Sequence, residues 1–154
     1  MDVGTCANAT LKVEYNDPFI MEQFVPVEMC VVEKAYAVDL SADMAASGFA
    51  GDTITYTLTV TNLGNVADTF DLALGSFDFP TSLGMAEVGS LDPGASATFE
   101  VVVEIPADAA PADFDAVTVT VTSQTDPAAT DSAVLTTTVE GPPVIYIFLP
   151  VVYK

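Results

Sequence analysis

The sequence contains no histidine and no tryptophan, and its only basic side chains are Lys12, Lys34 and Lys154, so it has no arginine either. Without an imidazole there is no catalytic triad of the serine-protease kind, no histidine ligand for zinc and no proton shuttle near neutral pH. Phosphate backbones and anionic membrane surfaces both require cationic partners. Three lysines against 22 Asp and Glu residues, a formal charge of -19, therefore argue against nucleic-acid binding.

Long apolar runs are also missing. No stretch reaches the roughly 20 apolar residues of a membrane-spanning helix, and the first residues lack the basic region and apolar core of a signal peptide. We therefore expect no membrane insertion. The chain is nevertheless 51% hydrophobic with a mean hydropathy of +0.46, which is too apolar for an acidic disordered tail. Its 154 residues suffice for one domain with a sizeable core.

Cysteine is scarce, with Cys6 and Cys30 as the two examples. Their spacing fits no metal-ligand pattern, and two thiols alone make a poor zinc site. A disulfide between them is the favoured interpretation, and two buried free thiols are the alternative. A disulfide indicates an oxidising, extracellular setting, and closing a loop of this length stabilises the fold by roughly 3 kcal/mol in the chain-entropy model.

Strict alternation of apolar and polar residues is the clearest structural signal. Residues 52–62 read DTITYTLTVTN, with threonine at every second position. Alternation with β-branched residues is typical of a half-buried strand in an antiparallel sheet. The same pattern recurs at residues 69–74, 97–105, 114–122 and 132–140, separated by turns rich in Gly, Pro, Asn and Asp. The sequence predicts that these side chains face the core: Ile54, Tyr56, Leu58, Val60, Phe70, Leu72, Leu74, Phe99, Val101, Val103, Ile105, Val117, Val119 and Val121.

Short strands at near-regular spacing with no helical periodicity predict an all-β fold, an immunoglobulin-like antiparallel β-sandwich with N- and C-terminal strand extensions. We expect three parts. Residues 1–34 form a strand-bearing extension, residues 35–140 form the sandwich, and residues 141–154 form a Gly-Pro-Pro hinge with an apolar strand.

A family resemblance accompanies these patterns. The runs GDTITYTLTVTNLGNVADTFDLAL, GSLDPGASATFEVVVEIPADA and VTVTVTSQTDPAATDSAVLTTTV, within about residues 38–139, resemble NEW3-type immunoglobulin-like modules and the related DUF11 and CARDB-type repeats. The resemblance implies an extracellular sandwich appended to larger bacterial secreted or surface proteins. It implies no catalytic residues. The terminal YIFLPVVYK also resembles a short YLPLV-K ending on some bacterial secreted proteins.

Carboxylates and tyrosines supply the candidate ligand sites. Asp113 and Asp115 flank Phe114 and would point the same way on a strand, so they could share a calcium ion; two solvated loop acids are the alternative. No recognisable catalytic setting surrounds any carboxylate, so we predict no enzyme activity and no required cofactor. Tyrosine side chains that stack against sugar rings are a further alternative, although Tyr56 fits the core better than such a binding platform.

The chain ends in an apolar segment whose two faces are both apolar, which is typical of a strand inside a sheet. This segment can fold back into its own sandwich, add to the open sheet edge of a neighbouring subunit, or serve as a docking or sorting signal. The donor residues in the second case are Val144, Ile145, Tyr146, Ile147, Phe148, Leu149, Val151, Val152 and Tyr153.

We predict a non-enzymatic extracellular or cell-surface structural protein whose copies join head to tail, with the C-terminal strand as donor, into a filament or surface layer. The expected acceptor comprises residues 11–15 and 25–32. An accessory module of a larger secreted protease or glycosidase, with the tail as anchor or sorting signal, is the first alternative. A carbohydrate-binding module is the second.

Overall fold

A computed structural model describes residues 6–13 and 23–142, and within these ranges every regular element is a β-strand. The predicted all-β class is confirmed. The chain divides into two compact units, Met1–Ala35 and Tyr36–Lys154.

The first unit contains a two-stranded antiparallel hairpin. Strand β1 (Cys6–Val13) pairs with β2 (Gln23–Cys30), and the register places Cys6 directly opposite Cys30. The two cysteines form a disulfide across this pair, with 4.0 Å between their Cα atoms. The bond therefore fixes the register of the hairpin at its open end.

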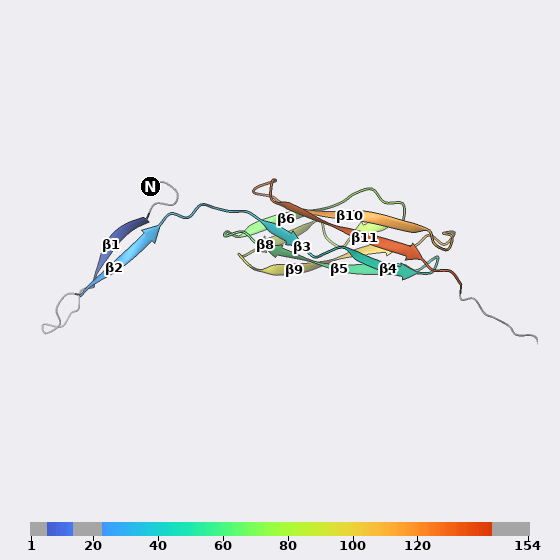
Figure 1. Cartoon of the computed structure of the whole chain (residues 1–154), viewed down its shortest axis with the longest axis horizontal. Helices are drawn as coiled ribbons and strands as arrows, with labels where there is room; N and C mark the ends of the chain where they lie inside the picture. The colour runs from blue at the N-terminus through green and yellow to red at the C-terminus, as the bar shows by residue number, and fades with distance from the viewer. Residues whose placement is uncertain (1–5, 14–22, 143–154) are drawn as a thin grey trace, which may run out of the picture. The chain divides into compact units, whose positions relative to one another are not determined.

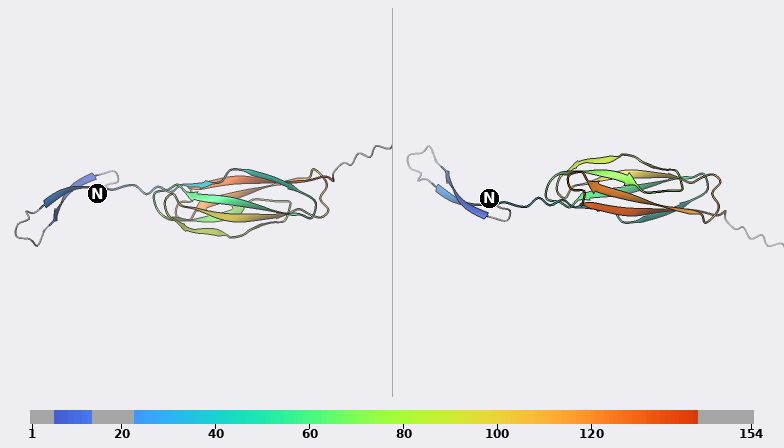
Figure 2. Two further views of the ribbon diagram at one scale, coloured as in Figure 1. Left: turned by 90° about the horizontal axis from the view of Figure 1, so that it is seen from below. Right: turned by 90° about the horizontal axis from the view of Figure 1, so that it is seen from above.

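The second unit is a sandwich of two sheets (Figures 1 and 2). One sheet has the strand order β4-β11-β10-β6-β8 and the other β3-β5-β9-β7. All pairings are antiparallel except that of β4 with β11, which is parallel. The bounds are β3 (Val38–Leu40), β4 (Met44–Gly48), β5 (Thr53–Asn62), β6 (Asp68–Leu74), β7 (Thr81–Leu83), β8 (Glu87–Leu91), β9 (Ser96–Glu104), β10 (Phe114–Ser123) and β11 (Thr130–Val139).

The core lies between these two sheets because each long strand turns one apolar face inward. In β5 the buried apolar side chains are Tyr56, Leu58 and Val60, while the intervening threonines face outward. The predicted inward sets of β9 and β10 are buried as well, and in β6 Phe70 and Leu72 are buried. Ile54 and Leu74 are half-buried at the margin of the core. The alternation read from the sequence is thus the pattern that forms the core.

Three short strands were not foreseen. Strands β4, β7 and β8 have five, three and five residues, too few to show a clear period. Contacts with the neighbouring strands decide their conformation, because local preference is weak over so few residues.

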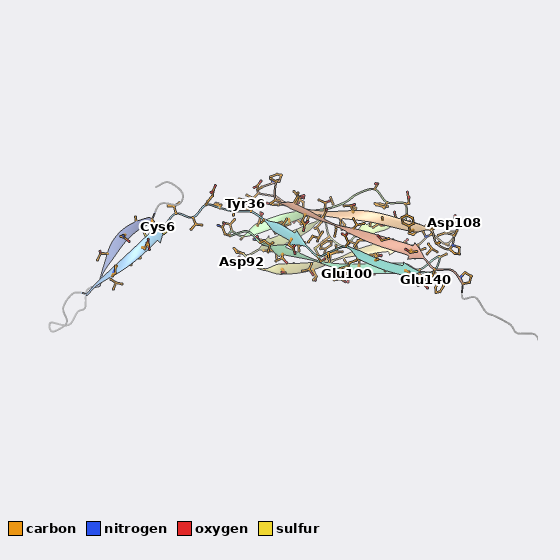
Figure 3. The ribbon with its side chains drawn as sticks, viewed as in Figure 1. Cys6, Tyr36, Asp92, Glu100, Asp108 and Glu140 are labelled. Atoms are coloured by element: carbon orange, nitrogen blue, oxygen red, sulfur yellow. A yellow bond between two sulfur atoms is a disulfide. The ribbon has the colours of Figure 1, made fainter. Side chains whose placement is uncertain are left out.

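The chain enters the sandwich at one end and leaves it at the opposite end (Figure 3). Ala37 accepts a hydrogen bond from the amide of Leu63 at one end, and the amide of Glu140 donates to Gly48 at the other. In Figure 3 Tyr36 and Asp92 lie at the first end, and Asp108 and Glu140 at the second. Whatever precedes residue 36 and follows residue 142 is therefore attached to opposite ends of this unit.

We expect Leu58→Ala to lower the free energy of unfolding of the sandwich by about 2–5 kcal/mol, because Leu58 is fully buried and its removal leaves a cavity. Leu63→Ala removes the same atoms at a position that is 60% exposed, and should change stability by less than about 0.5 kcal/mol. Chemical denaturation of both variants provides the measurement. Equal losses would contradict the assigned core.

Candidate functional site

The hairpin exposes an apolar face. Val25, Val27 and Met29 are every second residue of β2 and are 38%, 36% and 58% exposed. Ala9 and Ala7 of β1 stand opposite Val27 and Met29, so they share this face. The opposite face includes Asn8, Thr10, Pro26 and Glu28 in addition to the disulfide. The polar side chains among these residues therefore lie on one face of the hairpin, away from Val25, Val27 and Met29. The sequence signal for this arrangement is the alternation in VPVEM, residues 25–29.

A two-stranded sheet with an exposed apolar face is incomplete in physical terms. An isolated hairpin is marginally stable in water, and three or more strands, or packing against another element, are normally required. Each strand of a pair also leaves the N–H and C=O groups of its outer edge free for another strand. The disulfide offsets part of the instability, since it limits the freedom of the unfolded hairpin. Among the described residues no further strand pairs with either edge of the hairpin, so the backbone groups of these edges could pair with another strand.

The predicted donor and acceptor lie partly outside the described residues. Donor residues 144–153 lie outside them entirely. In the acceptor, residues 25–32 are described, whereas residues 14 and 15 are not, and for residues 11–13 only the backbone is. Their joining across copies stays a prediction.

A surface pocket of about 260 Å³ lies on the sandwich, lined by Ser76, Phe77, Asp78, Phe114, Asp115 and Ala116. Phe114 and Asp78 also line a second pocket of about 410 Å³ beside it. Phe77 and Phe114 are 43% and 65% exposed, so aromatic rings and carboxylates meet here. The tyrosines considered above contribute nothing to these pockets among the described residues: Tyr56 is buried and its hydroxyl donates to the Thr136 carbonyl at 2.8 Å.

Asp113 and Asp115, the candidate calcium ligands, have different surroundings. Asp115 is buried and accepts a hydrogen bond from the amide of Phe79 at 3.1 Å. Asp113 is exposed and accepts from the amide of Ala110 at 2.8 Å, closing a turn. Each carboxylate thus holds a separate backbone segment. Calcium binding by this pair stays a prediction.

Within the part of the chain that is described, one group of three potential metal ligands lies within 4.8 Å: Cys6, Glu28 and Cys30. Both of its sulfur atoms are used in the disulfide, so they are not thiolates that could bind a metal. The described residues also include no helix with the length and apolar character that a membrane crossing requires.

No sequence pattern predicts that the carboxylate of Asp68, at the start of β6, is buried. Its oxygens accept hydrogen bonds from the hydroxyls of Ser123 at 2.5 Å and Thr125 at 2.8 Å, and from the Thr69 amide at 2.9 Å. Ser123 in turn accepts from the amide of Asp126 at 2.9 Å. This network ties the start of β6 to the turn between β10 and β11. The two hydroxyl partners, Ser123 and Thr125, are 55 and 57 residues from Asp68, so no local pattern reveals the network.

The pKa of Asp68 is set by two opposing effects. Burial disfavours the charged carboxylate and raises the pKa, but the hydrogen bonds from Ser123, Thr125 and the Thr69 amide favour it and prevail. The pKa therefore lies below its ordinary value. Asp68 is ionised in the folded protein at neutral pH, and its role is structural.

No protein-family model and no curated protein matches the chain. Several solved structures are similar to it. A PapD-like domain of human CEP192 is 14% identical with a TM-score of 0.49, covering 68% of this chain and 87% of that one. The secreted serine protease VesC of Vibrio cholerae is 18% identical with a TM-score of 0.44, covering 67% of this chain and 23% of that one. Alpha-2-macroglobulin of Escherichia coli, from domain MG7 to its C-terminus, is 23% identical with a TM-score of 0.45, covering 70% and 16%.

The folded unit is an immunoglobulin-like β-sandwich of two sheets. The matched part spans less than a quarter of the protease and macroglobulin chains. With TM-scores below 0.5 and identities below 25%, these likenesses say nothing about function. The resemblance to NEW3, DUF11 and CARDB-type modules stays a prediction.

We expect Asp68→Asn to destabilise the sandwich at neutral pH by about 1–3 kcal/mol, because two hydroxyls and an amide lose a charged acceptor. The native pKa lies below the unfolded value, so this stabilisation is present above about pH 4 and is lost as the pH falls through the native pKa. Denaturant titrations from pH 7 to pH 3 should therefore show the two proteins converging.

The matched control is Asp108→Asn, which removes the same charge from an exposed position. It should leave stability nearly unchanged or raise it slightly, because the sandwich carries a large negative charge. A constant difference between the Asp68 variant and the wild type at every pH would contradict the ionised state of Asp68.

Proposed function

We propose that this protein is a non-enzymatic extracellular structural subunit whose copies assemble head to tail into a filament or surface layer. In each contact the apolar C-terminal segment of one copy adds as a strand to the N-terminal hairpin of the next. The observation that carries the proposal is the hairpin itself: a two-stranded sheet that pairs with no further strand among the described residues, and whose apolar face, formed by Val25, Val27 and Met29, is exposed.

The geometry of the sandwich supports a head-to-tail arrangement. The chain enters it near Tyr36 and leaves it near Glu140, at opposite ends (Figure 3). Acceptor and donor are therefore attached to different ends of the same body. An interface between two different surfaces does not close on itself unless the rotation between copies permits a ring, so it produces an open chain of subunits.

The distribution of charge supports the same arrangement. Sixteen of the 22 carboxylates, and no lysine, lie between residues 36 and 142. The first 35 residues carry six carboxylates and two lysines, whereas the last twelve carry one lysine and no carboxylate side chain. Sandwiches therefore repel one another, whereas the last twelve residues bring no carboxylate side chain to the acidic surface of a neighbouring copy. Charge repulsion thus opposes contacts between sandwich surfaces more than contacts made by the C-terminal segment.

The disulfide supports an extracellular location, since such bonds persist in oxidising compartments. A calcium ion bound by the acidic sandwich would be compatible with this setting, and no cofactor is required for strand donation.

Removing the C-terminal segment should abolish assembly. We expect the intact chain to form filaments or sheets in electron micrographs and large particles by light scattering, and a chain ending at Glu140 to remain monomeric. The sandwich should unfold at the same temperature in both, because its core cluster lies within residues 40–139.

Two other results would contradict the proposal. Monomers from both chains, with a less stable truncated protein, would make the segment an intramolecular strand and favour the accessory-module alternative. Specific binding to a glycan array without assembly would favour a carbohydrate-binding module, for which the pocket at Phe77 and Phe114 is the place to test.

Assembly should also depend on ionic strength. At a net charge of -19 the copies repel at long range, and a salt concentration of about 0.15 M shortens that repulsion to about 8 Å. We expect the critical concentration for assembly to fall as NaCl rises from about 10 to about 150 mM. Sedimentation at each salt concentration provides the measurement. An opposite trend would mean that attraction between charges, rather than apolar strand pairing, holds the copies together.

A further inference from the structure

We propose that the donated strand pairs with the outer edge of β1, and that the outer edge of β2 is not used. This inference rests on the proposed function and names the surface that receives the donor. The donor is the C-terminal segment of a second copy, residues 143–154.

The direction of each backbone N–H group in the hairpin follows from its register. In an antiparallel pair, opposite residues alternate between close pairs, whose N–H and C=O groups point to the outer edges, and wide pairs, which bond to each other. Close pairs have Cα atoms about 4.5 Å apart and wide pairs about 5.5 Å. Cys6 and Cys30 are opposite each other at 4.0 Å, so they form a close pair. Residues an even number away from them belong to the same set.

Pro26 tests this assignment independently. It is four residues from Cys30 and stands opposite Thr10, so it belongs to a close pair and its nitrogen faces the outer edge of β2. Proline has no N–H to donate, and in a sheet it is found where that nitrogen is not needed for the ladder. The hairpin accordingly continues through Pro26 without a change of register. The same proline leaves a gap among the donors of the outer edge of β2.

The outer edge of β1 has no such gap. Its outward N–H groups belong to Cys6, Asn8, Thr10 and Lys12, and none of these is proline. Strand β1 also contains no carboxylate, whereas β2 carries Glu28. A further strand therefore finds a complete set of donors and no negative charge on β1.

The C-terminal segment fits this edge in length and composition. Between Pro143 and Pro150 it has six consecutive residues with backbone N–H groups, 144–149, and all six are apolar or aromatic. Strand β1 has eight residues, about 27 Å at 3.4 Å per residue, which is long enough to pair with all six. A third strand beside β1 also extends the apolar face that Val25, Val27 and Met29 begin.

Proline substitutions in the full-length chain test the proposal. Asn8→Pro removes an outward N–H from β1, and Glu28→Pro removes the N–H directly opposite, on the outer edge of β2. Both leave the hydrogen bonds within the hairpin intact, as Pro26 does. We expect Asn8→Pro to raise the critical concentration for assembly about tenfold, the effect of losing roughly one hydrogen bond, and Glu28→Pro to leave it within about twofold. Asn8→Ala, which keeps the N–H, should assemble like the wild type.

Two measurements establish that the hairpin has formed in each variant: titration of free thiols, which should find none, and limited proteolysis of the first 35 residues. Loss of assembly with Glu28→Pro but not Asn8→Pro would move the donor to β2 and overturn the inference, while the proposed function would stand. Loss in both variants would overturn the preference for β1. Normal assembly of every proline variant, with none after truncation at Glu140, would show that the donor binds elsewhere. Assembly of the truncated chain, or no assembly of the intact chain, would overturn both proposals.

Discussion

Each long strand of the sandwich must bury one of its two faces, and the arrangement of the sheets follows from this requirement. Neighbouring side chains on a strand point to opposite sides of the sheet. In β5 and in β10, which belong to different sheets, threonine occupies one side and Leu, Tyr or Val the other, so each sheet has one apolar face. These two faces pack together, and the largest buried side chains, among them Leu58, Phe70 and Leu135, belong to one core cluster. The short edge strands then add to sheets whose positions are already fixed, and they limit unwanted pairing at the edges.

The hairpin follows the same alternation but lacks a second layer among the described residues. Val25, Val27 and Met29 are therefore exposed where Leu58 and Val60 are buried, although the pattern along the strand is alike. In the sandwich, alternation yields a stable domain, whereas in the hairpin it leaves a sheet that can still accept a strand. The disulfide between Cys6 and Cys30 and the missing donor at Pro26 then distinguish its two edges. The proposed strand donation therefore uses the hairpin, the one sheet that has no second layer among the described residues.

The core holds the two sheets together, whereas the negative charge on the surface of the sandwich repels other copies. The sandwich gathers sixteen carboxylates without a single lysine, so its surface favours solubility and separation of copies. A few of these carboxylates have structural roles instead. Asp68 stays ionised because hydroxyls of Ser123 and Thr125 bind it, and Asp131 accepts a hydrogen bond from the amide of Leu40, which links β11 to β3 of the other sheet. Charge thus keeps surfaces apart, while the hydrogen-bonded carboxylates of Asp68 and Asp131 join loops and strands together.

The β class, the long strands and their inward residues can be predicted from the sequence, because alternation and turn residues are local properties of the chain. The parallel pairing of β4 with β11, the conversion of three- and five-residue segments into edge strands, and the hydrogen bond between Asp68 and Ser123 follow only from the folded arrangement. These depend on partners distant in the sequence, which no local pattern encodes. The hairpin shows both levels at once. Its alternation in VPVEM is visible in the sequence, whereas the outward direction of the Pro26 nitrogen follows from the pairing of Cys6 with Cys30.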